Sequence, residues 1–149
     1  VSLPAPAGWD FNPYNRGDGL GFISLATPPG QGTLASGATA LSLLEGEPIG
    51  PAGSFSPDQL LGTNFHFTGI SYAGFRFYHE GNGLLNYGWA RLSTTAGPDP
   101  GFPATLLGYA YEDGGGPILA GQVPEPSAPG LVGLAVLAAL RRRRRPQVR

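Results

Sequence analysis

The chain contains no cysteine, no methionine and no lysine among its 149 residues. The absence of cysteine excludes disulfide bonds, thiolate metal sites and a cysteine nucleophile in this chain. A domain without disulfides depends on its own apolar core for stability. The 2 tryptophans, 6 tyrosines and 8 phenylalanines are enough to form one.

Charged residues are also scarce, at 13% of the chain, and they are unevenly distributed. Residues 1–127 carry three arginines and all ten acidic residues, a formal charge of −7, whereas residues 128–149 carry six arginines and no acid. An acidic body does not suit DNA, RNA or an anionic membrane surface as a partner. We therefore expect no nucleic-acid partner.

Glycine and proline are abundant instead, with 25 and 16 residues, and they divide the chain into short segments. Frequent glycine and proline between aromatic and aliphatic runs are typical of a turn-rich all-β domain. No alternation of strands and helices suggests a parallel sheet. The sequence predicts an antiparallel β-sandwich or open barrel, followed by a short C-terminal hydrophobic helix.

Strands are expected where apolar residues recur at every second position or form short runs. The clearest signal is that of a β-hairpin. Its two strands flank Gly81-Asn82-Gly83, a turn sequence that accepts positive φ angles. Apolar residues at a period of two start at Phe65, where we expect the first strand of this region. Phe75, Phe77 and His79 lie on one face of a second run that leads into the turn. The expected strands cover 21–25, 34–44 (strand or short helix), 65–72, 75–80, 87–92 and 104–112, and residues 118–123 close the domain. The expected loops cover 28–32, 48–57, 98–103 and 113–117.

The last 27 residues combine three unlike elements. A proline-flanked acidic pentapeptide comes first, and its prolines keep it extended and accessible. An apolar run without charge, residues 128–140, follows, and its length corresponds to about 20 Å of helix. The arginine cluster that ends it cannot cross a bilayer and stays cytoplasmic. The pentapeptide is Val123, Pro124, Glu125, Pro126 and Ser127, and the cluster is Arg141, Arg142, Arg143, Arg144 and Arg145.

This tail closely resembles the PEP-CTERM sorting signal of Gram-negative bacteria. The resemblance implies that exosortase, an integral-membrane cysteine protease, recognises the tail and cleaves near the Pro-Glu-Pro element. The protein would be held briefly in the inner membrane through residues 128–140 and then reach the cell surface or the extracellular space. Because the chain begins at Val1 without methionine, we expect an export signal peptide upstream.

The apolar run is short for a bilayer whose hydrocarbon core is about 30 Å thick. A marginal span suits an anchor that is later removed, which is the interpretation we favour. A permanent single-pass anchor is the alternative, and a buried core helix is a weaker one because the run has no polar face. The domain organisation expected is an exported all-β domain at 1–122 and a sorting signal at 123–149, divided into 123–127, 128–140 and 141–149.

A second resemblance concerns the body of the protein. Phe75-Arg76-Phe77 and the segments 87–92, 104–112 and 117–121 resemble a recurrent ectodomain that precedes PEP-CTERM tails. That ectodomain generally lacks an assigned activity, and the resemblance supplies no catalytic residue. We therefore expect no enzymatic activity and no cofactor, and the sequence predicts no metal site.

Several side chains nevertheless suggest chemistry. His66 and His79 are the only histidines, and we expect structural or surface roles for both. Glu80 with Glu112 and Asp113 could supply the paired carboxylates of a glycoside hydrolase, but a strand end that meets a Gly-rich turn explains the same acids. Glu112 could instead pair with an arginine such as Arg91. Asn12, Asn15 and Asp18 form a possible calcium loop, but their spacing misses the EF-hand pattern.

The tyrosines and tryptophans suggest either a sheet core or a platform on which sugar rings stack. We favour the core and keep the platform as an alternative. The residues concerned are Trp9, Tyr14, Tyr72, Tyr78, Tyr87, Trp89, Tyr109 and Tyr111.

The sequence thus predicts a non-catalytic, exported surface or matrix protein. Its expected partners are exosortase and, as the family resemblance implies, extracellular polysaccharide in a biofilm. A carbohydrate-binding module, or less favourably a glycan hydrolase, is the alternative function.

Replacement of Arg141 to Arg145 by alanine is expected to abolish processing, because the tail loses the charges that stop its transfer across the membrane. Immunoblotting of membrane and surface fractions would reveal an unprocessed chain. Normal processing of the alanine variant would contradict the assigned role of the arginine cluster.

Overall fold

The structure is a computed structural model that describes residues 11–124. It is almost entirely β-structure, in agreement with the predicted fold class. One 3₁₀-helix, η1 (Thr63–Phe65), interrupts the strands. The strands are β1 (Asn12–Asn15), β2 (Leu20–Ile23), β3 (Gly32–Ser36), β4 (Thr39–Ala40), β5 (Ser42–Leu43), β6 (Pro48–Ile49), β7 (Phe55–Ser56), β8 (Leu60–Leu61), β9 (Gly69–His79), β10 (Leu84–Thr94), β11 (Thr105–Glu112) and β12 (Ile118–Leu119).

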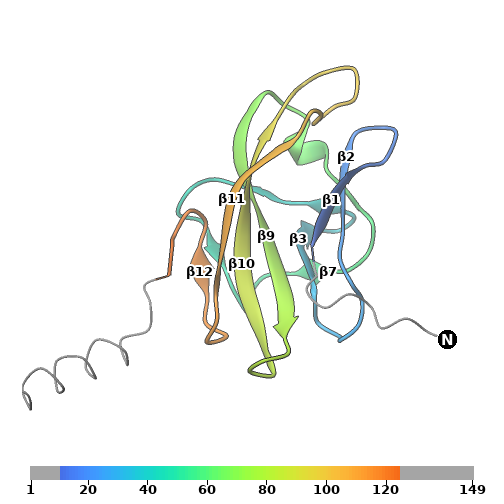
Figure 1. Ribbon diagram of the computed structural model, residues 1–149. Helices are drawn as coiled ribbons and strands as arrows, with labels where there is room; N and C mark the ends of the chain where they lie inside the picture. The colour runs from blue at the N-terminus through green and yellow to red at the C-terminus, as the bar shows by residue number, and fades with distance from the viewer. Residues whose placement is uncertain (1–10, 125–149) are drawn as a thin grey trace, which may run out of the picture.

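Ten strands form one sheet in the order β1-β2-β8-β4-β3-β9-β10-β11, with β5 on β9 and β7 on β3 off this path. The sheet curls into a half-barrel, with β1 and β11 as its two ends (Figure 1). All pairings are antiparallel except the single parallel bridge between β4 and β8. β6 and β12 form a separate two-stranded sheet. The open-barrel form of the prediction is therefore the better description.

The central hairpin β9–β10 is the longest pairing, in register from Gly69 opposite Thr94 to His79 opposite Leu84. Residues 80–83 connect its strands, as the Gly81-Asn82-Gly83 sequence predicts. The Asn82 side chain accepts a hydrogen bond from the Leu84 N–H at 2.9 Å, and Gly83 has a φ of 72°. The turn is thus fixed by an asparagine that bonds locally and a glycine in the left-handed region.

Each face of the central hairpin packs on a different core. The face that carries Phe75 and Phe77, named here the groove face, continues into the barrel core, which consists of Leu20, Phe22, Ala35, Ala40, Leu60, Phe65, Ala73 and Leu92. The opposite face packs on the second core, which consists of Leu34, Leu43, Ile49, Tyr72, Tyr87, Trp89, Ile118 and Ala120. Alternation along β9 and β10 assigns successive side chains to these two cores.

Three local predictions are wrong. The two runs expected at 65–72 and 75–80 are not separate strands, because β9 continues without a break from Gly69 to His79. Phe65 does not begin a strand; it lies in η1 and is fully buried in the barrel core beside Phe22, with ring centroids 4.9 Å apart. Residues 48–57 are not all loop, because they contain β6 and β7. Pro48 is compatible with β6 because this strand pairs only with β12, so its missing N–H breaks no central ladder.

The C-terminal hydrophobic helix that the sequence predicts lies outside the described residues. Within residues 11–124, no helix is long and apolar enough to cross a membrane.

Replacement of Phe22 by alanine is expected to lower the free energy of unfolding by about 3–5 kcal/mol, because it leaves a cavity between two aromatic neighbours, Phe11 and Phe65. Chemical denaturation of the variant and the wild type measures this difference. Leu107→Ala is the matched control, since this leucine is 46% exposed and its removal should cost about 0.5 kcal/mol or less. Equal losses in the two variants would contradict the position of the barrel core.

Candidate functional site

The half-barrel is open between its two end strands, since no pairing joins β1 to β11 within residues 11–124. A groove of about 510 Å³ lies along this opening, and we name it the seam groove. This volume falls within the range of about 300–1,000 Å³ that is typical of ligand sites. Its lining consists of Phe11, Pro13, Phe75, Phe77, His79, Glu80, Ala90, Leu106, Tyr109 and Tyr111.

The period of two along β9 and β11 produces this lining. Phe75, Phe77 and His79 alternate along β9 and project from the groove face, as the sequence predicts for one face of this strand. On β11, Tyr109 and Tyr111 alternate in the same way. Between the two strands, β10 presents Gly88 and Ala90 opposite Tyr111 and Tyr109, which leaves room for the rings above it.

Gly88 of β10 is required for this arrangement. A Cβ atom at this position would lie 2.5 Å from Cζ of Phe75 and 2.8 Å from the carbonyl oxygen of Ala110. Any side chain here would displace the phenylalanine ring. The glycine therefore lets Phe75 lie directly against the sheet and form the floor of the seam groove.

Aromatic rings run continuously across the groove. Phe11 stacks on Phe75 with centroids 5.2 Å apart, and Phe75 contacts Phe77 at 5.9 Å. Phe77 meets Tyr111 edge-to-face at 5.2 Å and lies 6.3 Å from the ring of His79. These separations are within the range for favourable aromatic pairs. The groove is thus a preformed aromatic surface rather than a collection of isolated rings.

The predicted aromatic set divides between core and surface. Three of its members, Tyr72, Tyr87 and Trp89, are buried in the second core. Tyr109 and Tyr111 are 64% and 40% exposed and line the seam groove. Tyr14 and Tyr78 are half-buried and do not line it, and Trp9 lies outside the described residues.

Sequence reasoning missed the three phenylalanines that complete the surface, Phe11, Phe75 and Phe77, because it considered only tyrosine and tryptophan as sugar-stacking residues. The alternation at Phe75 and Phe77 was visible. Their proximity to Phe11 and Tyr111 was not, because it depends on how the sheet curls.

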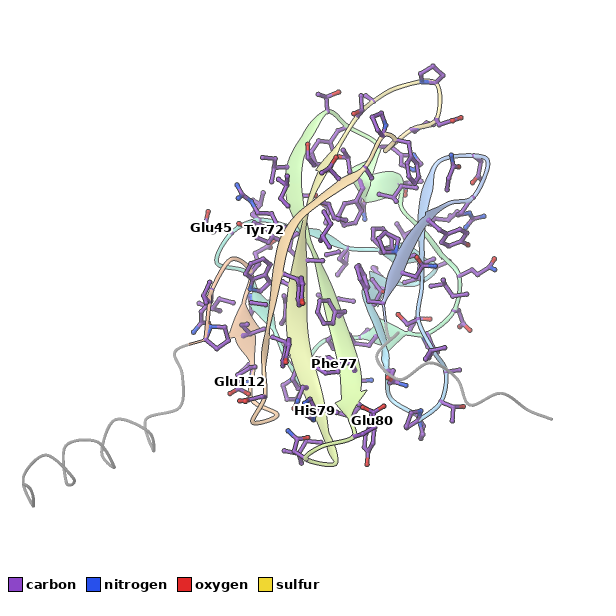
Figure 2. All side chains as sticks on the ribbon, in the orientation of Figure 1. Glu45, Tyr72, Phe77, His79, Glu80 and Glu112 are labelled. Carbon is purple, nitrogen blue, oxygen red and sulfur yellow. The ribbon has the colours of Figure 1, made fainter. Side chains whose placement is uncertain are left out.

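The polar groups of the groove lie at one end of β9, where Figure 2 shows Phe77, His79 and Glu80 following one another. Nδ1 of His79 accepts a hydrogen bond from the Gly81 N–H at 3.1 Å, which ties the ring to the hairpin turn. Glu80 is exposed and forms no hydrogen bond or ion pair with the other residues of 11–124. Its carboxylate is therefore the accessible negative charge of the seam groove.

Glu112 does not join Glu80 in the groove. It follows Tyr111 on β11, so alternation directs it to the opposite face. One of its carboxylate oxygens, Oε2, accepts hydrogen bonds from the N–H groups of Gly114 at 2.6 Å and Gly116 at 3.2 Å. The carboxylate organises the turn that leads out of β11.

The suggested pairing of Glu112 with Arg91 is wrong. Arg91 is opposite Gly108, whereas Glu112 is opposite Tyr87 at the end of the strand. The only ion pair within residues 11–124 joins Nε of Arg16 to Oδ1 of Asp18 at 3.2 Å.

The histidines are far apart, because His66 precedes β9 and His79 ends it. Nε2 of His66 lies 3.4 Å from the carbonyl oxygen of Leu20, at the other end of the barrel. Within residues 11–124, no group of three or more His, Cys, Asp or Glu side chains could hold a metal ion.

The suggested calcium loop is instead a hydrogen-bonded turn between β1 and β2. Oδ1 of Asn15 accepts the Gly17 N–H at 2.7 Å, and Asp18 pairs with Arg16. Asn12 lies in β1, opposite Ile23. These local bonds use Oδ1 of Asn15 and Oδ1 of Asp18 to hold the turn.

The comparisons with known proteins identify the tail. Residues 122–145 match the family model of the PEP-CTERM protein-sorting motif, which agrees with the resemblance drawn from the sequence. The matched range contains both the Pro-Glu-Pro pentapeptide and the arginine cluster. Of these, only Val123 and Pro124 lie among the described residues. The chain has no significant match among curated proteins or solved structures.

Replacement of Glu112 by alanine is expected to lower the free energy of unfolding by about 1 kcal/mol, because two backbone N–H groups lose their acceptor. Glu80→Ala is the matched control and should change stability by about 0.5 kcal/mol or less. Thermal denaturation of both variants measures the difference. A loss confined to Glu80→Ala would contradict the assigned role of Glu112.

Proposed function

We propose that this chain, which carries the PEP-CTERM protein-sorting motif at residues 122–145, is a non-catalytic exported protein that exosortase processes and delivers to the cell surface or extracellular matrix. The motif itself implies export, exosortase processing and sorting to the surface. The match at the end of a compact all-β domain is the observation that carries the proposal.

The junction between domain and motif supports this division of the chain. The Gln122 carbonyl accepts a hydrogen bond from Nε1 of Trp89 at 2.8 Å, and the Gln122 side chain accepts one from the Leu119 N–H at 3.0 Å. The next residue, Val123, is 73% exposed. The fold therefore holds the chain up to Gln122 and leaves the start of the sorting motif accessible to a protease.

The arrangement of carboxylates supports a non-catalytic role. A glycoside hydrolase uses two carboxyl groups on either side of the scissile bond, about 5–9.5 Å apart. Glu80 lines the seam groove, whereas Glu112 bonds to its own turn on the opposite face. Among the two alternatives to a purely structural matrix protein, the groove thus favours a binding module over a hydrolase.

This proposal and a permanent single-pass membrane protein differ in whether the apolar run stays attached to the domain. In the proposed route, residues 128–140 hold the protein in the inner membrane only until cleavage. The surface protein then consists of the all-β domain and a short remnant of the pentapeptide. Under the alternative, the apolar run and the arginine cluster stay with the domain.

The intact mass of the protein isolated from its native host tests the proposal. We expect a C-terminus near Pro124-Glu125-Pro126, with the apolar run and all five clustered arginines removed. Deletion of the gene for exosortase is the control, and it should restore the full-length mass. A chain that ends at Arg149 in wild-type cells would contradict exosortase processing and favour the permanent anchor.

A further inference from the structure

Asn86 is a fully buried polar side chain near the turn end of the central hairpin, where it is the third residue of β10, with 0% of its surface exposed. Neither its Oδ1 nor its Nδ2 has a hydrogen-bond partner within residues 11–124. Ser71, which is 3% exposed, likewise has an unpaired hydroxyl oxygen. Buried polar groups without partners are rare in folded proteins, and each costs about 1–3 kcal/mol.

Both unpaired side chains belong to the groove face. Asn86 is directly opposite Phe77, and it alternates with Gly88 and Ala90, of which Ala90 lines the seam groove. Ser71 lies on the same face of β9 as Phe75 and Phe77, because it precedes them by an even number of residues. The unsatisfied polar groups therefore coincide with the side of the sheet that carries the groove.

Two aromatic rings meet over the strand that carries Asn86. Phe77 comes from β9 and Tyr111 from β11, on either side of β10, and their rings make the edge-to-face contact at 5.2 Å. Gly88, the residue opposite Tyr111, adds no side chain between them. The register thus places Asn86 on the groove face next to these two rings, although it does not itself line the groove, and Tyr111 is the more exposed of the two aromatic residues.

We propose that the seam groove binds an uncharged saccharide chain, with sugar rings stacked on Tyr109 and Tyr111 and a sugar hydroxyl bonded to the Asn86 amide. This inference rests on the proposed role of the domain as a non-catalytic exported protein and names its ligand class. The amide offers both a donor and an acceptor, as a hydroxyl does, so one sugar hydroxyl can use either. Outward rotation of the Tyr111 ring opens the way to it.

The chemistry of the groove selects an uncharged sugar over other ligands. Its rings present flat apolar faces, which match the C–H faces of a pyranose. Among residues 11–124, the titratable groups that line it are His79, Glu80 and the two tyrosines, and no arginine lines it. The body of the protein is acidic, so an anionic polysaccharide would meet repulsion and no compensating cation.

An unpaired amide also predicts an unusual relation between stability and binding. Replacement of Asn86 by leucine removes two unsatisfied polar atoms and fills a similar volume, so it should leave stability unchanged or raise it. The same change removes the bond to the sugar. A residue with a purely structural role would show the reverse, a loss of stability without any effect on binding.

The test is isothermal titration calorimetry on the full chain, purified in a detergent whose headgroup is not a sugar. The probes are cellohexaose, mannohexaose and xylohexaose as neutral oligosaccharides, hexagalacturonic acid as the anionic one and a proline-rich decapeptide. We expect binding of at least one neutral oligosaccharide and weaker or no binding of the acid and the peptide.

Three variants assign the site. Tyr109→Ala should lower the affinity about tenfold or more, which is the scale of one lost stacking contact. Leu107→Ala is its control, because this leucine is equally part of β11 and exposed but does not line the groove. Asn86→Leu should lose affinity while its thermal midpoint stays equal or rises.

Three results would overturn the proposal: a folded wild type that binds none of the neutral probes, preferential binding of the acid or the peptide, or unchanged affinity in both Tyr109→Ala and Asn86→Leu. None of these bears on exosortase processing, which the C-terminal mass decides separately. Normal processing with no sugar binding would thus leave the sorting function intact and reject the binding site alone.

Discussion

The eleven-residue pairing of β9 with β10 is the constraint on which the rest of the structure depends. It is the one long ladder in a sheet whose other strands contain two to eight residues, and the barrel core and the second core both pack against it. A shift of one residue in its register would exchange the side chains between the two cores. Trp89 would then leave the second core, and the hydrogen bond from its Nε1 that holds Gln122 at the end of the domain would be lost.

Both functional regions derive from this hairpin. On one face, the period of two sends Phe75 and Phe77 into the seam groove, and on the other it sends Trp89 toward Gln122. The two regions are therefore independent in space although they share the same strands. A domain built in this way can bind a ligand along its open seam while its tail passes to another protein.

The sequence predicted those features that local physics determines. The hairpin turn at Gly81-Asn82-Gly83 and the strand at 104–112 follow from turn chemistry and alternation, and the sorting signal follows from three unlike elements in a fixed order.

The features that the sequence did not predict depend on contacts between distant segments. Phe65 fits a strand by its period, yet η1 carries it into the barrel core. Glu112 was a reasonable partner for an arginine, yet the adjacent Gly-rich turn supplies closer N–H donors. Phe11 joins the groove only because the sheet curls.

The open seam itself has a physical consequence. Closure of the barrel by direct pairing of β1 with β11 would satisfy the free edge of β11 and cover its exposed apolar side chains, Leu106, Tyr109 and Tyr111. It would also bury the groove. Within residues 11–124, the protein instead keeps an apolar edge strand without a charge from Thr105 to Tyr111, and an amide without a partner on the same face of the sheet. Each feature reduces stability, and both occur on the same side of the same three strands. Selection for stability alone would remove them separately, for example through a lysine on the edge or a leucine at position 86. A ligand in the proposed seam site would offset both costs, because a sugar can stack on the exposed rings and bond to the buried amide at once.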